Sequence, residues 1–151
     1  MPLPDSRGYF KLPQRPEQAA YYTYGTPPNG LMQYAHPNLM TFLLQLEFRW
    51  GHHDNRKLGI GNISLAHGVQ PPDHLGHRNG LQVDIRPVRR SGKPLPVRYQ
   101  DPDYDREATR RLVELIWQTG MANAVLFNDL QIPRVRFQVR HDDHLHVSIR
   151  T

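Results

Sequence analysis

Apolar residues recur at two spacings along the chain, and these spacings separate the predicted helices from the predicted strands. Residues 37–50 carry leucines at three- and four-residue intervals, the period of one helix face. The further apolar side chains beside them predict a central, mostly buried helix. Asn38 is its expected N-cap and Gly51 its expected end. A second helix is predicted over 103–119, where an acidic first turn suits the helix dipole, with Gly120 as its stop.

The final segment, 141–150 (HDDHLHVSIR), alternates between apolar and polar residues and predicts a half-buried strand. Leu145, Val147 and Ile149 would share one face. His144 and His146 would share the other, because side chains of a strand alternate with a period of two. Shorter strands are predicted at 57–65, 81–85, 124–127 and 135–139.

This order of elements predicts an α+β fold, with a small, mostly antiparallel sheet and helices packed on one face. The 151 residues fit a single domain spanning 1–151. Residues 1–37 are rich in Pro, Tyr, Gly and Gln without a clear period, so we expect an irregular N-terminal segment laid over the surface.

Composition narrows the possible chemistry. The chain has no cysteine, which excludes disulfides, thiolate nucleophiles and cysteine zinc sites, so any metal must be held by His, Asp or Glu. A net charge of +5 suits a polyanionic partner, although solubility alone would also explain it. We expect no membrane span, because no stretch is long and apolar enough. The first residues also lack the pattern of a signal peptide.

A candidate metal site lies in the loop and strand DHLGHRNGLQVDIRP. The spacing His77-x6-Asp84 would let a loop histidine fold back toward an aspartate on the strand, with Gly80 at the turn. Together with His146, these residues form a three-ligand set with an open position for water, as catalytic zinc requires. His144 and His141 would then be free for proton transfer and for stabilising an oxyanion.

Three blocks of the sequence, GNISLAHGV, HLGHRNGLQVDI and HDDHLHV, resemble the signature blocks of the penicillin-insensitive murein endopeptidases. That family belongs to the LAS group of metallopeptidases, which shares its fold with the hedgehog signalling domain. The resemblance implies that His77, Asp84 and His146 bind zinc and that His144 is catalytic. It also matches His141 and His74 to family histidines; we expect His141 to be catalytic and His74 to lie behind the ligands or to face the substrate.

The resemblance implies a zinc-dependent peptidoglycan endopeptidase. The expected bonds are amides in the peptide cross-links of murein, between D-alanine and meso-diaminopimelate. Such an enzyme would act in the periplasm or cell envelope. Without a signal peptide, it would arrive there by another route, as a delivered cell-wall-degrading toxin or a lysin does, unless a leader has been removed. Delivery machinery and an immunity protein are conceivable partners, whereas nucleic acid is not expected.

Two alternatives stay open from the sequence. One is a zinc-containing module that binds the cell wall without catalysis, and the presence of both His141 and His144 weighs against it. The other is a metal-dependent nuclease, which would prefer magnesium or manganese, whereas a set of two histidines and one aspartate favours zinc. The arginine-rich stretch 86–98 is either a solvated loop or a surface facing anionic peptide stems.

Overall fold

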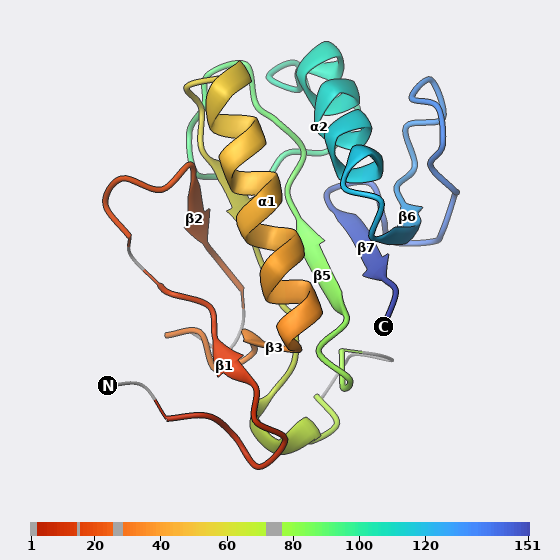
Figure 1. Ribbon diagram of the computed structural model, residues 1–151. Coiled ribbons are helices and arrows are strands. Elements are labelled where there is room, and N and C mark those ends of the chain that lie inside the picture. Colours follow the sequence, from red (N-terminus) through yellow and green to blue (C-terminus); the bar gives the residue numbers. More distant parts are fainter. Residues whose placement is uncertain (1–2, 15, 26–28, 72–76) are drawn as a thin grey trace.

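The computed structural model describes residues 3–14, 16–25, 29–71 and 77–151. In this part of the chain, two α-helices, a mixed five-stranded sheet and a two-stranded sheet form an α+β fold, as predicted. Both helices lie over the same side of the large sheet (Figure 1), which confirms the expected layer arrangement. Neither helix is long and apolar enough to cross a membrane.

Helix α1 (Pro37–His53) is the central helix that the leucine spacing predicts, but both of its ends differ from the prediction. The N-cap is His36, whose Nδ1 accepts a hydrogen bond from the Asn38 backbone N–H. The helix continues through Gly51 to His53, because Trp50 is fully buried and the Asp54 N–H still donates to the Trp50 carbonyl. Packing of the buried face therefore outweighs the helix-ending tendency of glycine.

Helix α2 (Arg106–Gln118) begins three residues later than predicted. Its N-cap is Asp105, whose carboxylate accepts a hydrogen bond from the Ala108 N–H at 3.0 Å. Asp103 lies outside the helix because its carboxylate binds the Arg89 side chain at 2.7 Å. The helix ends before Gly120, as predicted, and this glycine has the left-handed φ of +72° that is typical after a helix.

The large sheet has the strand order β2-β4-β5-β7-β6. Three of its four pairings are antiparallel, as predicted, and only β2 and β4 run parallel. The strands are β2 (Tyr21–Thr23), β4 (Leu58–Ile60), β5 (Gln82–Ile85), β6 (Ala122–Leu126) and β7 (Leu145–Ile149).

The N-terminal segment is less irregular than predicted. It contributes β2 to the edge of the large sheet, and β1 (Phe10–Lys11) pairs antiparallel with β3 (Tyr34–Ala35). Tyr21 fastens the segment to the core: its ring is buried, and its hydroxyl donates to the Pro13 carbonyl at 2.7 Å. Strands of two or three residues are too short to produce a readable alternation in the sequence.

The strand predicted at 135–139 is wrong. Only Arg136 makes a bridge, to Leu126, and Phe137 and Val139 are exposed. The left-handed backbone at Arg134 and Arg140 bends the chain away at both ends of this stretch. The alternation here accordingly does not correspond to a buried face.

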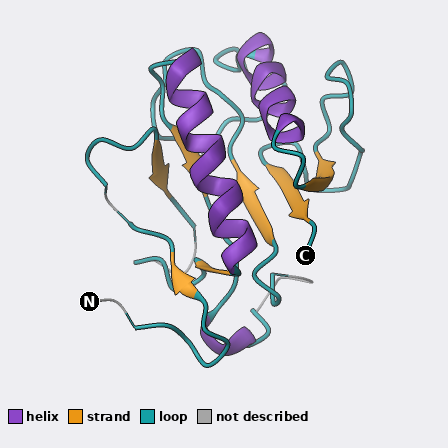
Figure 2. Cartoon of the chain, viewed as in Figure 1, coloured by secondary structure: helices purple, strands orange, loops and turns teal. Residues whose placement is uncertain are grey.

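The core lies between the helices and the sheet. Val83 and Ile85 of β5 and Leu145, Val147 and Ile149 of β7 pack with the apolar side chains of α1 and α2. Figure 2 shows the two helices lying over the strands of the large sheet. Since side chains alternate along a strand, the residues between them point to the opposite face of the sheet. That face carries the candidate site.

Candidate metal centre

Two of the three predicted ligands are brought together by the pairing of β5 with β7. Asp84 and His146 are directly opposite each other in this antiparallel ladder. The His146 Nδ1 lies 3.2 Å from the Asp84 Oδ1. The backbone of Asp84 is bonded on its other side to the chain around β4, where its N–H donates to the Asn62 carbonyl and its carbonyl accepts from the Gly61 N–H. Two central strands therefore fix both side chains.

The third ligand, His77, comes from the loop before β5 and has a left-handed φ of +56°. Its backbone N–H donates to the Gln82 Oε1 at 3.1 Å. Its ring Nδ1 lies 2.9 Å from the Ile63 carbonyl oxygen. Because a carbonyl can only accept, Nδ1 carries the hydrogen and Nε2 presents its lone pair. Gly80 makes the turn between loop and strand with a φ of +71°, as the spacing predicts.

The distances from the Asp84 carboxylate to the two histidine nitrogens match those between ligands of a tetrahedral ion. The His77 Nε2 lies 3.4 Å from the Asp84 Oδ1. The His146 Nδ1 lies 3.2 Å from the same oxygen. Ligands about 2.1 Å from a central zinc would lie roughly 3.4 Å apart. The ligand atoms of His77, Asp84 and His146 all lie within 4.8 Å of one another, so this buried group could hold a metal ion.

The group is buried and carries the negative charge of Asp84, which favours binding of a cation. His77 and Asp84 are only 5% and 8% exposed. Burial of the Asp84 carboxyl acts to raise its pKa, but hydrogen bonds with His146 and His77 outweigh it, and the pKa falls well below its ordinary value. Asp84 is therefore an anion at any pH at which the protein works, and it faces two imidazoles.

His144 and His141 lie beside the three ligands. The His144 Nε2 lies 3.9 Å from the Asp84 Oδ1, and its Nδ1 lies 2.8 Å from the Asp143 carboxylate. The ring of His141 lies 4.6 Å from that of His144 and 5.8 Å from that of His146, measured between centroids. All four predicted histidines that the structure describes thus meet around one aspartate.

His141 and His144, the two histidines beside the three ligands, have defined tautomers. The Nδ1 of His141 lies 2.9 Å from the Val139 carbonyl oxygen, so Nδ1 carries the hydrogen and Nε2 is left as a base. Burial lowers the pKa of His141; the hydrogen bond to Val139 opposes this effect, and the neighbouring His144 and His146 add to it. His144 instead donates from Nδ1 to a carboxylate, which holds its ring in place.

The chain before β7 is held by residues that sequence reasoning did not assign. Asn128 donates from its side chain to the Asp142 carboxylate at 2.7 Å, and its Oδ1 accepts from the Gln138 N–H. Gln100 also donates to Asp142. No spacing in the sequence points to Asn128, because it lies in a loop and its partners Asp142 and Gln138 lie further along the connection between β6 and β7.

The remaining histidines have structural surroundings. His36 caps α1, and His52 and His53 form its last turn. The Nδ1 of His67 accepts a hydrogen bond from the Ser6 N–H. His74, expected behind the ligands or facing the substrate, lies outside the described residues.

The N-terminal segment clamps the loop that carries His77. Asp5 is buried and accepts hydrogen bonds from the Arg7 side chain and from the His67 N–H. Arg7 in turn donates to the carbonyl of Arg78, the residue next to His77. Burial acts to raise the pKa of Asp5, but the hydrogen bonds from Arg7 and from backbone N–H groups lower it to about 2.

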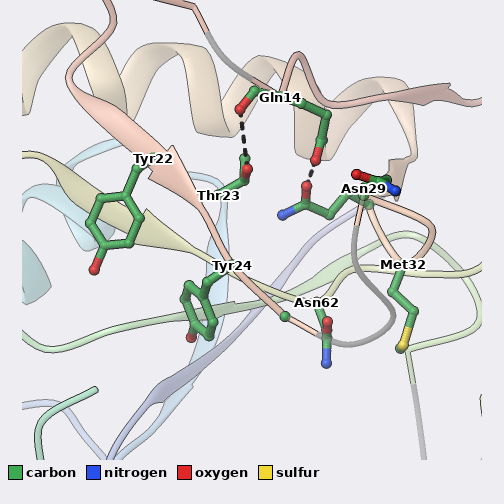
Figure 3. Close-up of a pocket in the computed structure, with 10 residues that line it drawn as sticks. Gln14, Tyr22, Thr23, Tyr24, Asn29, Met32 and Asn62 are labelled. Atoms are coloured by element: carbon green, nitrogen blue, oxygen red, sulfur yellow. Dashed lines mark hydrogen bonds between the residues drawn. The ribbon is translucent and has the colours of Figure 1, made fainter. Parts of the chain in front are cut away.

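A cavity of about 570 Å³ opens at the β2 edge of the sheet, lined by Tyr22, Tyr24, Asn62 and other residues (Figure 3). None of the three predicted ligands lines it, although the backbone carbonyl of Asn62 accepts a hydrogen bond from the Asp84 N–H. Burial, and then the charge of the nearby Asp84, raise the pKa of the Tyr24 phenol well above its ordinary value.

Comparison with known proteins adds no assignment: neither the family models nor the curated proteins searched contain a match to this chain.

Proposed function

We propose that this protein is a zinc-dependent peptidoglycan endopeptidase that hydrolyses amide bonds in the peptide cross-links of murein. One observation carries the proposal: two histidines and an aspartate converge at ligand spacing, with two further histidines beside them. A site that only bound a structural metal would not need His141 and His144 next to an open position. The resemblance of the three sequence blocks to murein endopeptidases supplies the substrate class.

Zinc is the ion that suits these donors. Two imidazole nitrogens and one carboxylate oxygen are borderline ligands, and the all-oxygen shells that magnesium and manganese prefer are absent from the described group. His77 would bind through Nε2, Asp84 through a carboxylate oxygen and His146 through Nδ1. Zinc held there would lower the pKa of water and polarise the scissile carbonyl.

His141 and His144 have different catalytic roles in this proposal. His141, with its unprotonated Nε2, takes the proton from the attacking water and later delivers it to the departing amine nitrogen. His144, held by Asp143, stabilises the negative charge that develops on the carbonyl oxygen. The water oxygen forms a bond to the carbonyl carbon, the C–N bond breaks, and no covalent enzyme intermediate is formed.

The cross-link bond is D-alanyl–meso-diaminopimelate, and the site of action is the periplasm or cell envelope. We propose delivery as a cell-wall-degrading toxin or lysin. A cell that makes such a protein would need protection, and an immunity protein is the partner that would supply it.

The test combines metal analysis with mass spectrometry of murein digested by the parent, His77→Ala and His144→Ala. The parent should retain about one zinc per chain and release cross-link cleavage products. His77→Ala should lose both zinc and activity. His144→Ala should keep zinc while its rate falls by about 10²- to 10³-fold, the usual contribution of a group that stabilises the oxyanion.

His53→Ala, at the exposed end of α1, is the matched control and should behave like the parent. If the parent binds zinc but leaves murein intact, that result would contradict the proposed endopeptidase activity and favour a zinc-containing module that only binds the cell wall. DNA cleavage supported by magnesium or manganese would favour a nuclease instead.

A further inference from the structure

Two tyrosines lie flat against the sheet next to the metal group. Tyr22 and Tyr24 project from the same side of β2 and the residue after it (Figure 3). They lie over Gly59 of the adjacent strand β4 and over Gly61, which follows that strand. A Cβ at Gly59 would come within 2.7 Å of the Tyr22 hydroxyl oxygen, and one at Gly61 within 2.6 Å of the Tyr24 ring. The two glycines therefore leave the space that the rings occupy.

Arg86 rests on these rings. Its guanidinium carbon lies 3.8 Å from the Tyr24 ring centroid and 5.8 Å from that of Tyr22. Its hydrogen bonds to the Tyr22 hydroxyl and the Pro94 carbonyl are both long, at 3.4 Å. A guanidinium stacked on an aromatic face keeps the N–H groups at its edge directed sideways, where they can bind an anion in a bidentate manner.

The charge of Arg86 is not neutralised in the way that those of its neighbours are. Arg56 binds the carboxylate of Asp105, and Arg89 binds that of Asp103. Within residues 3–14, 16–25, 29–71 and 77–151, no carboxylate lies within ion-pair distance of Arg86. A half-buried arginine without such a partner beside a candidate active site is suited to bind an anionic group of a ligand.

Arg86 also stands at a defined distance from the metal group. It follows Asp84 by two residues on the same face, and its N–H continues the ladder by donating to the Gly59 carbonyl. Residues two apart on a strand are about 7 Å apart along the chain. In a diaminopimelate cross-link, the carbon that carries the scissile nitrogen also carries a carboxylate, so that carboxylate lies a few bonds from the reacting carbonyl.

We propose that Arg86, supported by Tyr22 and Tyr24, binds the carboxylate on the amine side of the scissile amide and so selects diaminopimelate cross-links. This inference rests on the proposed endopeptidase function. A lysine-type cross-link has hydrogen in place of this carboxylate. It would leave the guanidinium without an anion and would be cleaved less efficiently.

The experiment compares two synthetic cross-linked peptide dimers that differ only in diaminopimelate or lysine at the amine side. The parent should prefer the diaminopimelate dimer by about 10- to 100-fold in kcat/KM, the effect of one charge-assisted pair. Arg86→Gln should lose this preference by cleaving the diaminopimelate dimer more slowly, with the lysine dimer unchanged. Arg86→Lys should keep part of the preference.

Arg111→Gln, on the exposed face of α2 on the other side of the sheet, is the matched control and should keep the parent's preference. Zinc content and the thermal midpoint establish that each variant is folded. An Arg86→Gln enzyme that still discriminates as the parent does would overturn this inference alone. A zinc-loaded parent that cleaves neither dimer would overturn the endopeptidase function, and the inference with it.

Discussion

The metal group has a strand half and a loop half, which are held in place by different means. Asp84 and His146 lie opposite each other in the centre of a five-stranded sheet, where paired strands on both sides fix the backbone. His77 lies in a loop with a left-handed backbone, and it donates hydrogen bonds to the Gln82 side chain and to the Ile63 carbonyl. The strand half therefore depends on the sheet as a whole, whereas the loop half depends on contacts of the individual loop residue.

The largest expected effect comes from removing a ligand in the strand half. His146→Ala should abolish stoichiometric zinc binding, and with it the rise in thermal midpoint that added zinc gives the parent. Ser148→Ala, two residues further along the same face of β7, should retain both. Zinc titration followed by thermal unfolding measures the two effects. If His146→Ala still bound one zinc tightly, the strand half would not be part of the site.

A smaller effect is expected when the loop half is loosened without loss of a ligand. Gln82→Ala removes the oxygen that accepts the His77 N–H, and zinc affinity should fall by about 10- to 100-fold, as it does when groups behind metal ligands are lost. Gln82→Glu keeps an acceptor oxygen and should stay close to the parent. Competition with a chromophoric chelator measures the affinities. Equal affinities for the parent and Gln82→Ala would show that the loop positions His77 by other contacts.

The smallest effect is expected for Asp5, which holds Arg7 against the loop that carries His77. The pKa of Asp5 is lowered to about 2 in the folded protein, so its charged form stabilises the fold above the unfolded pKa, by about 1 kcal/mol once screening by solvent is included. This contribution is lost as the pH falls through 4 toward 2. Asp5→Asn should therefore be less stable than the parent at pH 7, and the difference should shrink on acidification.

Urea unfolding at pH 7, 4 and 2.5 tests this dependence. Glu114→Gln, on the exposed face of α2, should differ little from the parent throughout. A constant difference between Asp5→Asn and the parent at all three pH values would show that Asp5 acts by packing rather than by its charge.

The strand half could be predicted from the sequence more completely than the loop half. Alternation in β7 places His146 on the face away from the core, and the burial of Leu145, Val147 and Ile149 confirms that assignment. The spacing between His77 and Asp84 indicates that the two meet. It contains no information on how His77 is held, because the acceptor for its ring is the backbone carbonyl of Ile63, 14 residues away.

The strands that were predicted wrongly or missed also depend on partners that are remote in the sequence. The residues 135–139 alternate as a strand does, yet they bridge to the sheet only at Arg136. Strand β2, by contrast, has only three residues and takes its place by pairing with distant β4. Local patterns report local periodicity, whereas membership of a sheet depends on partners that are remote in sequence. The N-cap His36 escaped prediction because histidine is not among the usual N-cap residues.

The pairing of Asp84 with His146 joins residues that are 62 positions apart in the chain, with helix α2 and strand β6 between them. Contacts of such long sequence separation are costly in loop entropy and are favoured only once the intervening elements are in place. The metal group therefore depends on long-range pairing and cannot form from a local segment of the chain. An unfolded chain would lack this arrangement of ligands, and the group would be complete only where the whole sheet has formed.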